Sequence, residues 1–312
     1  RTIGNMLRTR PITVSFEITY NCNARCEHCD LGEYVQEPRL GPEVFAGWLR
    51  RLQPAVAQIS GGEPLLRKDL VEIVRVMRAQ DEVAVFVLTT NVQNMTEKRY
   101  HELRAAGLDQ FSFSLDYPDE RHNAFRHLRG NFEKMSELVP KLAACENRDI
   151  VLACVVQSDN FRDLPRLAEL AKEWGVAINF STYNALRTKK RHYLISTPSD
   201  LAELTTVVDR LAAMQREGYP IVTSEWTMRR MIRFFREGAM PRCRAGERFL
   251  IVNPWGKLTP CGMCRDHYDD PVQIREQFTR TNTCNECYTA IRANSEKSPY
   301  RLMVDALRAA RS

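Results

Sequence analysis

The stretch Cys22-Asn23-Ala24-Arg25-Cys26-Glu27-His28-Cys29 lies just past an apolar run at 12–19. A short loop with this C-x3-C-x2-C spacing can bring three thiolates around one metal centre. Thiolates select zinc, Cu(I) or iron–sulfur clusters over hard cations. A structural zinc site and an all-cysteine [4Fe–4S] cluster each take four ligands. The motif therefore indicates either a centre with one open metal position or a zinc knuckle whose fourth ligand lies elsewhere in the chain.

A second motif, Ser60-Gly61-Gly62-Glu63-Pro64, follows the next apolar run at 56–59. Paired glycines after a strand let the backbone approach a ligand closely. The three-cysteine loop after one strand and the GGEP stretch after the next together resemble the radical SAM superfamily. The resemblance implies that Cys22, Cys26 and Cys29 hold a [4Fe–4S] cluster whose open iron binds S-adenosylmethionine (SAM). It also implies that SAM is cleaved to a 5′-deoxyadenosyl radical.

The resemblance extends to about Tyr183 and implies further contacts with SAM. A serine that ends the fourth predicted strand and an arginine beyond it match the SAM-contacting pair of that family. Arginine can grip the methionine carboxylate in a charge-assisted fork, although Arg126 is equally consistent with a surface arginine. The implied SAM-contacting residues are Gly61, Gly62, Glu63, Pro64, Asn91, Ser114, Asp116 and Arg126.

The composition is that of an ordinary globular protein. Of the 312 residues, 44% are hydrophobic and 27% are charged. No apolar run approaches the roughly 18 residues of a transmembrane helix, and no apolar signal core precedes the first motif, so we expect a cytoplasmic protein. A net charge of +6 permits an anionic substrate without indicating nucleic acid. Ten cysteines without a signal peptide favour metal binding over disulfides, and the isolated Cys145 and Cys154 are predicted to be buried thiols.

Hydrophobic periodicity predicts strands that alternate with helices. The strands are expected at 12–19, 56–60, 84–90, 110–115, 150–156 and 176–181, and the helices between them at 42–52, 68–79, 97–106, 131–144 and 163–174. This alternation is typical of parallel βα units with right-handed crossovers. Six such units predict an α/β fold, a partial (β/α)6 TIM-like barrel. The motifs lie where the strands end, which is where function gathers in such barrels.

The remaining sequence predicts two further parts. We expect the barrel at 1–198, connecting helices at 199–242, and a small domain at 243–312 with a β-hairpin at 249–259 and helices, the last at 300–312. The predicted helix at 226–236 is basic and amphipathic, so it either lies on a membrane or packs against the barrel. We expect packing.

A second cysteine group lies in this last part. Cys243, Cys261, Cys284 and Cys287 resemble the Twitch domain, the shortened relative of the SPASM domain, and the resemblance implies one auxiliary [4Fe–4S] cluster. No cysteine follows Cys287, so a second auxiliary cluster is not expected. The alternative is a zinc ribbon in which Cys261 and Cys264 pair with Cys284 and Cys287.

Cys264 is the cysteine that the Twitch pattern leaves over. It could be a free thiol, it could replace one of the four ligands, or it could donate a hydrogen atom to a substrate radical. The last role would make the protein a radical epimerase.

The resemblance implies reductive cleavage of SAM, hence an external electron donor such as a flavodoxin or ferredoxin. The auxiliary cluster could accept an electron from the substrate, which would make the reaction an oxidation. The cysteine motif begins at residue 22, so we expect no leader-binding domain, and this favours a small molecule, a sugar-like group or a lipid head group as substrate. A maturase that modifies a peptide presented by a separate partner is an alternative. Tyr183, Asn184 and Arg187 are either substrate contacts or structural loop residues. A non-catalytic iron–sulfur electron carrier is the alternative of another class.

Overall fold

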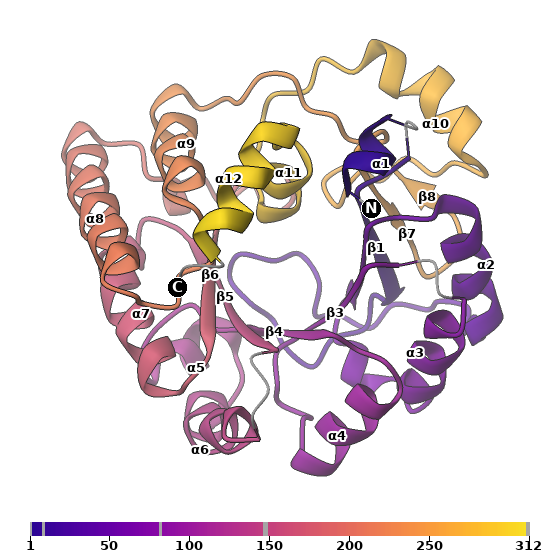
Figure 1. Ribbon diagram of the computed structural model, residues 1–312, viewed down its shortest axis with the longest axis horizontal. Coiled ribbons are helices and arrows are strands. Elements are labelled where there is room, and N and C mark those ends of the chain that lie inside the picture. The colour runs from indigo at the N-terminus through magenta and orange to yellow at the C-terminus, as the bar shows by residue number, and fades with distance from the viewer. Residues whose placement is uncertain (1, 8–9, 81–82, 146–148, 310–312) are drawn as a thin grey trace. The chain divides into compact units, whose positions relative to one another are not determined.

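The computed structural model describes residues 2–7, 10–80, 83–145 and 149–309 (Figure 1). The chain forms two compact units. The first contains Arg1–Ser112 and Cys243–Thr283, and the second contains Phe113–Arg242 and Cys284–Ser312. Both units are therefore built from segments that lie far apart in the sequence. The three-part division at 198 and 242 stays a prediction.

The strands of the first unit are mainly parallel. β1 (Thr13–Thr19) pairs with β2 (Val56–Gly61), and β2 pairs with β3 (Val85–Thr90). On its other edge, β1 pairs in parallel with β7 (Phe249–Val252), which continues into the antiparallel β8 (Leu258–Thr259). The order within this unit is β3-β2-β1-β7-β8. The segment after residue 243 therefore adds strands to the same sheet that carries the first two motifs.

Amphipathic helices follow these strands. α2 begins with a proline in its first turn, where a missing N–H costs nothing, and it buries Phe45, Ala46, Leu49 and Leu52 on one face. Figure 1 shows α2, α3 and α4 along the outside of β1, β2 and β3. The helices of this unit are α1 (Thr2–Leu7), α2 (Pro42–Leu52), η1 (Pro64–Leu66), α3 (Leu70–Arg78), α4 (Glu97–Ala105), α10 (Pro271–Gln277) and η4 (Thr279–Thr281).

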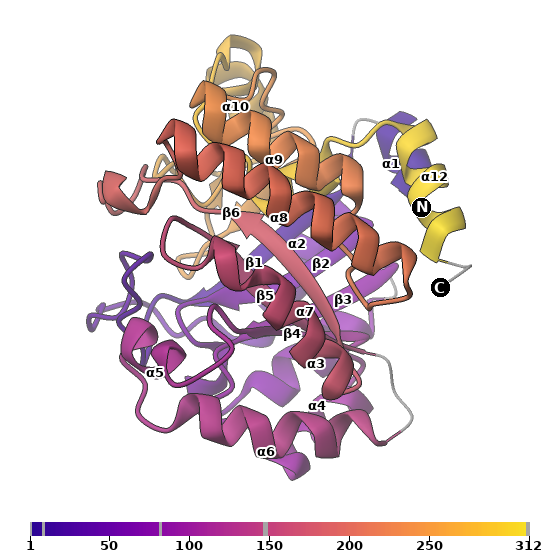
Figure 2. The same ribbon diagram turned by 90° about the vertical axis from the view of Figure 1, so that its left-hand side faces the viewer.

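In the second unit, β5 (Ile150–Val156) pairs in parallel with β6 (Ala177–Thr182). β4 (Gln110–Ser114) runs across the division between the units. Figure 2 shows α7 and α8 beside β6, and α7 contacts both α8 and β6. The helices of this unit are α5 (Arg121–Arg126), α6 (Asn131–Ala143), η2 (Phe161–Asp163), α7 (Leu164–Glu173), η3 (Arg191–Tyr193), α8 (Pro198–Arg216), α9 (Glu225–Glu237), α11 (Ala290–Ser295) and α12 (Pro299–Ala309).

The predicted α/β class is confirmed, with every predicted strand and helix present to within two residues at each described end. The predicted hairpin is β7 and β8, with a turn between them. The last helix is α12; residues 310–312 of that prediction lie outside the described residues. The short helices α1, α5, α10 and α11 were not predicted, because such short segments carry little periodicity.

The packing alternative for the basic amphipathic helix is supported. The apolar face of α9 is buried, including Met228, Met231 and Phe235. Arg229 on the other face pairs with Asp209 of α8 at 2.6 Å. Among the described residues, no helix has both the length and the apolar character needed to cross a bilayer.

The two isolated cysteines differ. Cys154 on β5 is buried as predicted, and burial raises the pKa of its thiol, which favours the neutral form. Cys145 is exposed, so that prediction was wrong. It lies two residues beyond the end of α6, outside the packed helix face, and its thiol lies 3.6 Å from the Lys141 carbonyl oxygen.

Candidate active site

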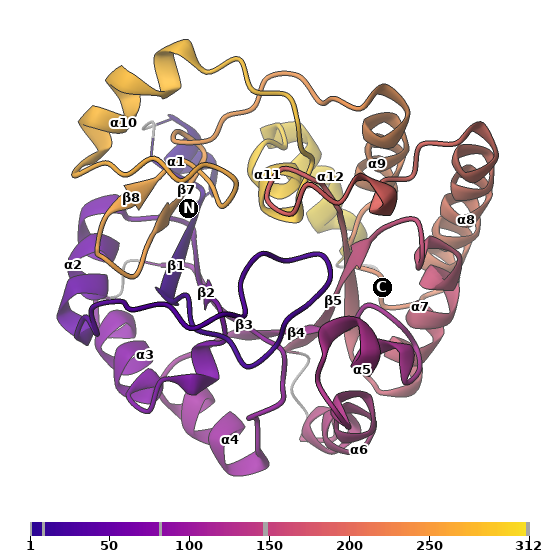
Figure 3. The ribbon, with the colours of Figure 1, turned by 180° about the vertical axis from the view of Figure 1, so that it is seen from behind.

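The loop that carries Cys22, Cys26 and Cys29 leaves β1 and returns at α2 (Figure 3). The Glu37 carboxylate closes its base by accepting the Thr19 hydroxyl and the Tyr20 backbone N–H, the latter at 2.7 Å. Asn21 pairs with the backbone of Val35 through both ends of its amide, at 2.9 and 3.0 Å. These contacts join the two arms of the loop on either side of the cysteines.

A buried arginine fixes both ends of the same loop. The Arg67 guanidinium donates to the carbonyl of Ile18 at 3.0 Å and to that of Leu40 at 2.7 Å. It also pairs with Asp69 through two hydrogen bonds of 3.0 and 2.7 Å. Only 7% of the Arg67 side chain is exposed, so these contacts are little screened by water. Arg67 therefore acts as a clamp between β1 and the start of α2.

The two glycines of GGEP are required by the backbone of this loop. Gly62 donates to the Thr19 carbonyl at 2.7 Å, and Glu63 donates to the Asn21 carbonyl at 2.9 Å. A Cβ on Gly62 would lie 2.1 Å from the Asn21 carbonyl oxygen. Gly61 has φ of +123°, and a Cβ there would lie 2.2 Å from the Thr19 carbonyl oxygen. The glycines let β2 and the start of the cysteine loop touch, and their contact with SAM stays a prediction.

Glu63 is buried and links two strand ends. One carboxylate oxygen accepts the Thr90 hydroxyl at 2.6 Å and the Leu65 N–H at 2.9 Å, and the other accepts the Asn91 N–H at 2.8 Å. Burial raises the pKa of Glu63, while these hydrogen bonds and the charge of Arg99 lower it. The net shift is upward, so desolvation dominates.

Asn91 extends this network to the cysteines. Its side-chain amide donates to the side-chain Oδ1 of Asn23 at 2.8 Å and lies 4.0 Å from the Cys22 sulfur. The cysteine loop, the end of β2 and the end of β3 are therefore connected through Glu63 and Asn91. Glu63 and Asn91, two of the predicted SAM contacts, therefore lie together. Pro64, a third, begins the short helix η1 and is buried.

The cysteine loop fits an iron–sulfur cluster. Its three thiols are half-buried and none is in a disulfide. The backbone N–H of Ala24 donates to the Cys22 sulfur and that of Leu31 to the Cys29 sulfur, each at 3.4 Å. Hydrogen bonds to sulfur are among the features that tune such clusters. Within the described part of the chain, no group of three His, Cys, Asp or Glu side chains gathers as around a single ion. A four-iron cluster takes one cysteine per iron and does not require that spacing.

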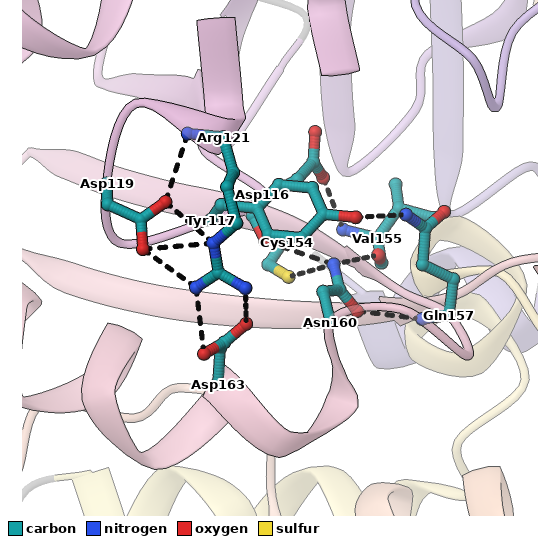
Figure 4. Close-up of polar contacts among 9 residues, drawn as sticks. All are labelled: Asp116, Tyr117, Asp119, Arg121, Cys154, Val155, Gln157, Asn160 and Asp163. Carbon is teal, nitrogen blue, oxygen red and sulfur yellow. Dashed lines mark hydrogen bonds and ion pairs between the residues drawn. The ribbon is translucent and has the colours of Figure 1, made fainter. Parts of the chain in front are cut away.

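In the second unit, Asp116 and Arg126 form a buried ion pair. Arg126 donates to one Asp116 oxygen through Nε at 2.8 Å and through Nη2 at 2.7 Å, with 7% and 0% of the two side chains exposed. The other Asp116 oxygen accepts the Val155 N–H at 3.0 Å (Figure 4). Arg126 is therefore not a surface arginine. Its predicted grip on the SAM carboxylate stays a prediction, as does the role of Ser114, the half-buried last residue of β4.

Figure 4 shows polar residues around Asp116 that sequence reasoning missed. The Asn160 amide donates to the carbonyls of Asp116 and Val155, both at 3.0 Å, and lies 3.6 Å from the Cys154 sulfur. The Gln157 amide donates to the Tyr117 hydroxyl at 3.1 Å, and burial raises the pKa of that phenol. Gln157 directly follows β5 and Asn160 lies four residues beyond its end, so their place near a strand end was the only available signal.

Two of the predicted substrate contacts after β6, Tyr183 and Asn184, contact residues of their own loop. Tyr183 is buried, and its hydroxyl contacts Thr188 and the Lys190 carbonyl. Its ring also packs edge-on against Tyr193 at 5.7 Å. These contacts favour the structural alternative for Tyr183. The Asn184 side chain accepts the Leu186 N–H at 3.2 Å, as a loop-forming residue does.

The C-terminal cysteines belong to both units. In the first unit, Asn282 donates to the Cys243 carbonyl at 2.9 Å, and the Cys264 N–H donates to the Cys261 carbonyl at 3.3 Å. The Cys264 thiol lies 3.4 Å from an Asp266 carboxylate oxygen. Its three possible roles all stay open.

Arg265, next to Cys264, pairs with Asp30 of the cysteine loop, and its guanidinium carbon lies 5.8 Å from the centre of the Tyr20 ring. Tyr20 in turn contacts Trp255 of the hairpin turn edge-on. The segment with Cys264 therefore lies beside the loop that carries Cys22, Cys26 and Cys29.

The other two predicted ligands, Cys284 and Cys287, lie in the second unit. Cys287 is 6% exposed and Cys284 is half-buried. Burial raises the pKa of the Cys287 thiol more than Arg292 and the Thr289 N–H lower it, so the net shift is upward. The cation and the backbone donor beside the sulfur are nonetheless the kind of neighbours that stabilise a metal-bound thiolate. The four-cysteine ligand set stays a prediction.

Comparison with known proteins agrees with the motifs. The chain is 27% identical over 268 residues to a PqqA peptide cyclase of Xanthomonas campestris, covering 80% of this chain and 67% of that protein. It is 26% identical to an AdoMet-dependent heme synthase of Methanosarcina barkeri, covering 81% of this chain and 77% of that protein. The chain thus spans about two thirds to three quarters of the length of these relatives.

A solved structure has the same fold. Streptococcus suis SuiB bound to its precursor peptide SuiA matches with a TM-score of 0.66 at 14% identity, over 87% of this chain and 67% of SuiB. This likeness supports the predicted partial (β/α) barrel. The model of the Radical SAM superfamily matches residues 16–171, half of the chain. This chain belongs to the radical SAM superfamily, whose members use SAM and a [4Fe–4S] cluster.

Proposed function

We propose that this radical SAM enzyme modifies a peptide. The observation that carries the proposal is the similarity to PqqA peptide cyclases over four fifths of the chain. SuiB, which shares the fold, was solved with a precursor peptide. The preference for a small molecule rested on the position of the cysteine motif near the first residue, and the sequence relatives favour the peptide alternative instead.

Cys22, Cys26 and Cys29 would hold the SAM-binding cluster. When bound, the cluster and SAM supply a radical that removes a hydrogen atom, and an auxiliary cluster supplies an acceptor for one electron. Glu37 and Arg67 hold the loop of these cysteines closed. Glu63 and Asn91 fix it to the ends of β2 and β3. An external flavodoxin or ferredoxin would reduce the first cluster.

Cys243, Cys261, Cys284 and Cys287 would hold the auxiliary cluster. The environment of Cys287, buried beside a cationic side chain, supports this assignment.

Forming a bond between two peptide atoms removes two hydrogens. Bound SAM would supply the acceptor of one hydrogen atom, and the auxiliary cluster would accept the electron when the other hydrogen leaves as a proton.

Oxidation of a small molecule is the second candidate. The observation in its favour is the similarity to the heme synthase. This chain covers a larger share of the heme synthase than of the PqqA peptide cyclase. Epimerisation with Cys264 as hydrogen donor lacks a comparable relative among the proteins described above. A purely electron-carrying role fits poorly, since both sequence relatives are enzymes.

The test uses anaerobically reconstituted enzyme with SAM and dithionite. Its substrates are the PqqA peptide of the Xanthomonas relative and each short peptide encoded beside the enzyme's own gene. We expect one of these peptides to lose two hydrogens by mass spectrometry, with one 5′-deoxyadenosine formed per modified peptide. The Cys22/Cys26/Cys29→Ala variant serves as the blank. Unchanged peptides, together with turnover of a haem precursor, would favour the second candidate.

A further inference from the structure

Arg292 on α11 is a fully buried arginine, with 0% of its side chain exposed. Its Nη1 donates to the carbonyl of Cys287 at 2.6 Å. Its Nη2 donates to the carbonyls of Met240 and Pro241 at 2.6 and 3.0 Å. Every one of these acceptors lies within the second unit. Arg292 therefore joins the turn that carries Cys287 to the segment that leads in sequence to Cys243.

A buried guanidinium is expensive unless it is paired and hydrogen-bonded. Glu296, one helical turn later, pairs with Nε at 3.1 Å and compensates the charge. That pair alone would hold the arginine on its own helix. The remaining N–H groups are directed to backbone carbonyls of two other segments, which is how an arginine fork fixes loop geometry.

A second cation lies at the same turn. Arg230 of α9 donates to the Tyr288 hydroxyl at 3.2 Å, and its guanidinium carbon lies 5.4 Å from the centre of the Tyr288 ring. It also lies 4.8 Å from the centre of the Trp226 ring. Tyr288 directly follows Cys287 and is itself buried. Two arginines from different helices thus converge on residues 287 and 288.

Positive charge and hydrogen bonds near an iron–sulfur cluster favour its reduced, more negative form. Because Glu296 compensates the charge of Arg292, Arg292 would act on a cluster at Cys284 and Cys287 mainly through its N–H donors, and Arg230 would add a second cation. Both effects would raise the reduction potential of the cluster. This direction suits a cluster that takes up an electron from substrate.

We propose that Arg292 is the positioning residue of the auxiliary cluster: it seats Cys287 and, with Arg230, makes the cluster a better electron acceptor. This inference rests on the auxiliary cluster proposed above. It goes beyond that proposal by naming the residue that fixes the position of Cys287 and affects the reduction potential of the cluster.

The test uses the full chain carrying Cys22/Cys26/Cys29→Ala, so that only the auxiliary cluster remains. Arg292→Met removes both the fork and the charge, whereas Arg292→Lys keeps the charge. Arg233→Lys is the matched control, because Arg233 is a half-exposed arginine of α9 paired with Glu237. Each protein is reconstituted anaerobically, assayed for iron and titrated by electron paramagnetic resonance.

We expect about four irons in the parent and the control, as one four-iron cluster contains. Arg292→Met should lose at least half of this iron, and the remaining cluster should have a more negative midpoint potential. Arg292→Lys should lose iron with a smaller potential shift, because its charge is kept. If Arg292→Met does not fold by circular dichroism, Arg292→Lys decides the question.

Arg292 variants with the iron content and potential of the Arg233→Lys control would overturn the inference and leave the auxiliary cluster intact. If the parent, Cys22/Cys26/Cys29→Ala, holds no iron, the chain has no auxiliary cluster. Both the proposed cluster and the role of Arg292 then fail. The two failures are therefore distinguishable in one experiment.

Discussion

The backbone N–H of Asn91 donates to the buried carboxylate of Glu63 at 2.8 Å. The Asn91 side chain continues to Asn23 in the cysteine loop. A carboxylate of the GGEP stretch is therefore connected, through the residue that directly follows β3, to the loop with Cys22, Cys26 and Cys29. The two motifs behave as one structure, and damage to either should appear at the cysteines.

Gly62→Ala should damage the cysteine loop although Gly62 is not a metal ligand. The added Cβ would lie 2.1 Å from the Asn21 carbonyl oxygen, which cannot move without its loop. Overpacking of this kind costs about 1–3 kcal/mol, and we expect less iron after reconstitution. Urea unfolding and iron assay measure the two effects.

Gly47→Ala is the control for that substitution. Gly47 lies inside α2, and a Cβ there would meet only the end of the flexible Arg50 side chain, at 4.0 Å. Alanine in a helix interior stabilises by about 0.5–1 kcal/mol relative to glycine. Equal iron content in both alanine variants would contradict the close contact between Gly62 and Asn21.

Arg67→Met should destabilise the protein much more than Arg39→Met, although both arginines pair with Asp69. Arg67 also serves the buried carbonyls of Ile18 and Leu40, and hydrogen bonds to charged groups contribute about 1.5–3 kcal/mol each. The Arg39 side chain is 63% exposed, so its loss should cost about 0–1 kcal/mol. The comparison is made by urea unfolding. Similar losses in the two variants would speak against the clamp.

Glu63 should make the free energy of unfolding depend on pH. Burial raises its folded pKa above the ordinary value of 4.5. Between 4.5 and the folded pKa, the folded protein therefore binds more protons than the unfolded chain. The stability contribution of Glu63 is full below 4.5 and is lost as the pH rises through the folded pKa.

Glu63→Gln lacks this ionisation. The difference in unfolding free energy between wild type and Glu63→Gln should fall as the pH rises above 4.5. Urea titrations at several pH values measure it. A difference that does not change with pH would refute the raised pKa of Glu63.

Asp116 and Arg126 should show strong coupling in a double-mutant cycle. Removing one partner of a buried ion pair leaves an uncompensated charge and costs about 3–5 kcal/mol. Asp116→Asn and Arg126→Met should each show such a loss, and the double variant should lose less than the sum. Additive losses by urea unfolding would mean that the two side chains do not depend on each other.

The sequence was sufficient for the order of strands and helices, because alternating periodicity and turn residues are local signals. It was also sufficient to place the motifs at strand ends. It did not predict that β7 pairs with β1, because residues 249–252 and 13–16 are joined only by tertiary structure. Local patterns contain no information on such a distant partner.

The support of the site was also invisible in the sequence. Arg67 and Arg292 bind backbone carbonyls, which every residue has, so no pattern of side chains marks their partners. The sequence was equally consistent with Arg126 as a SAM contact and as a surface arginine, because a six-residue helix shows no clear buried face. The chemistry-bearing residues were therefore easier to identify than the residues that hold them.

The most direct test of the account is the yield of 5′-deoxyadenosine from SAM by dithionite-reduced, anaerobically reconstituted protein. Wild type and Cys145→Ala, which changes an exposed cysteine with no assigned role, should both form it. The Cys22/Cys26/Cys29→Ala variant should form no more than a protein-free blank. An equal yield from that variant would contradict the assignment of SAM cleavage to this loop.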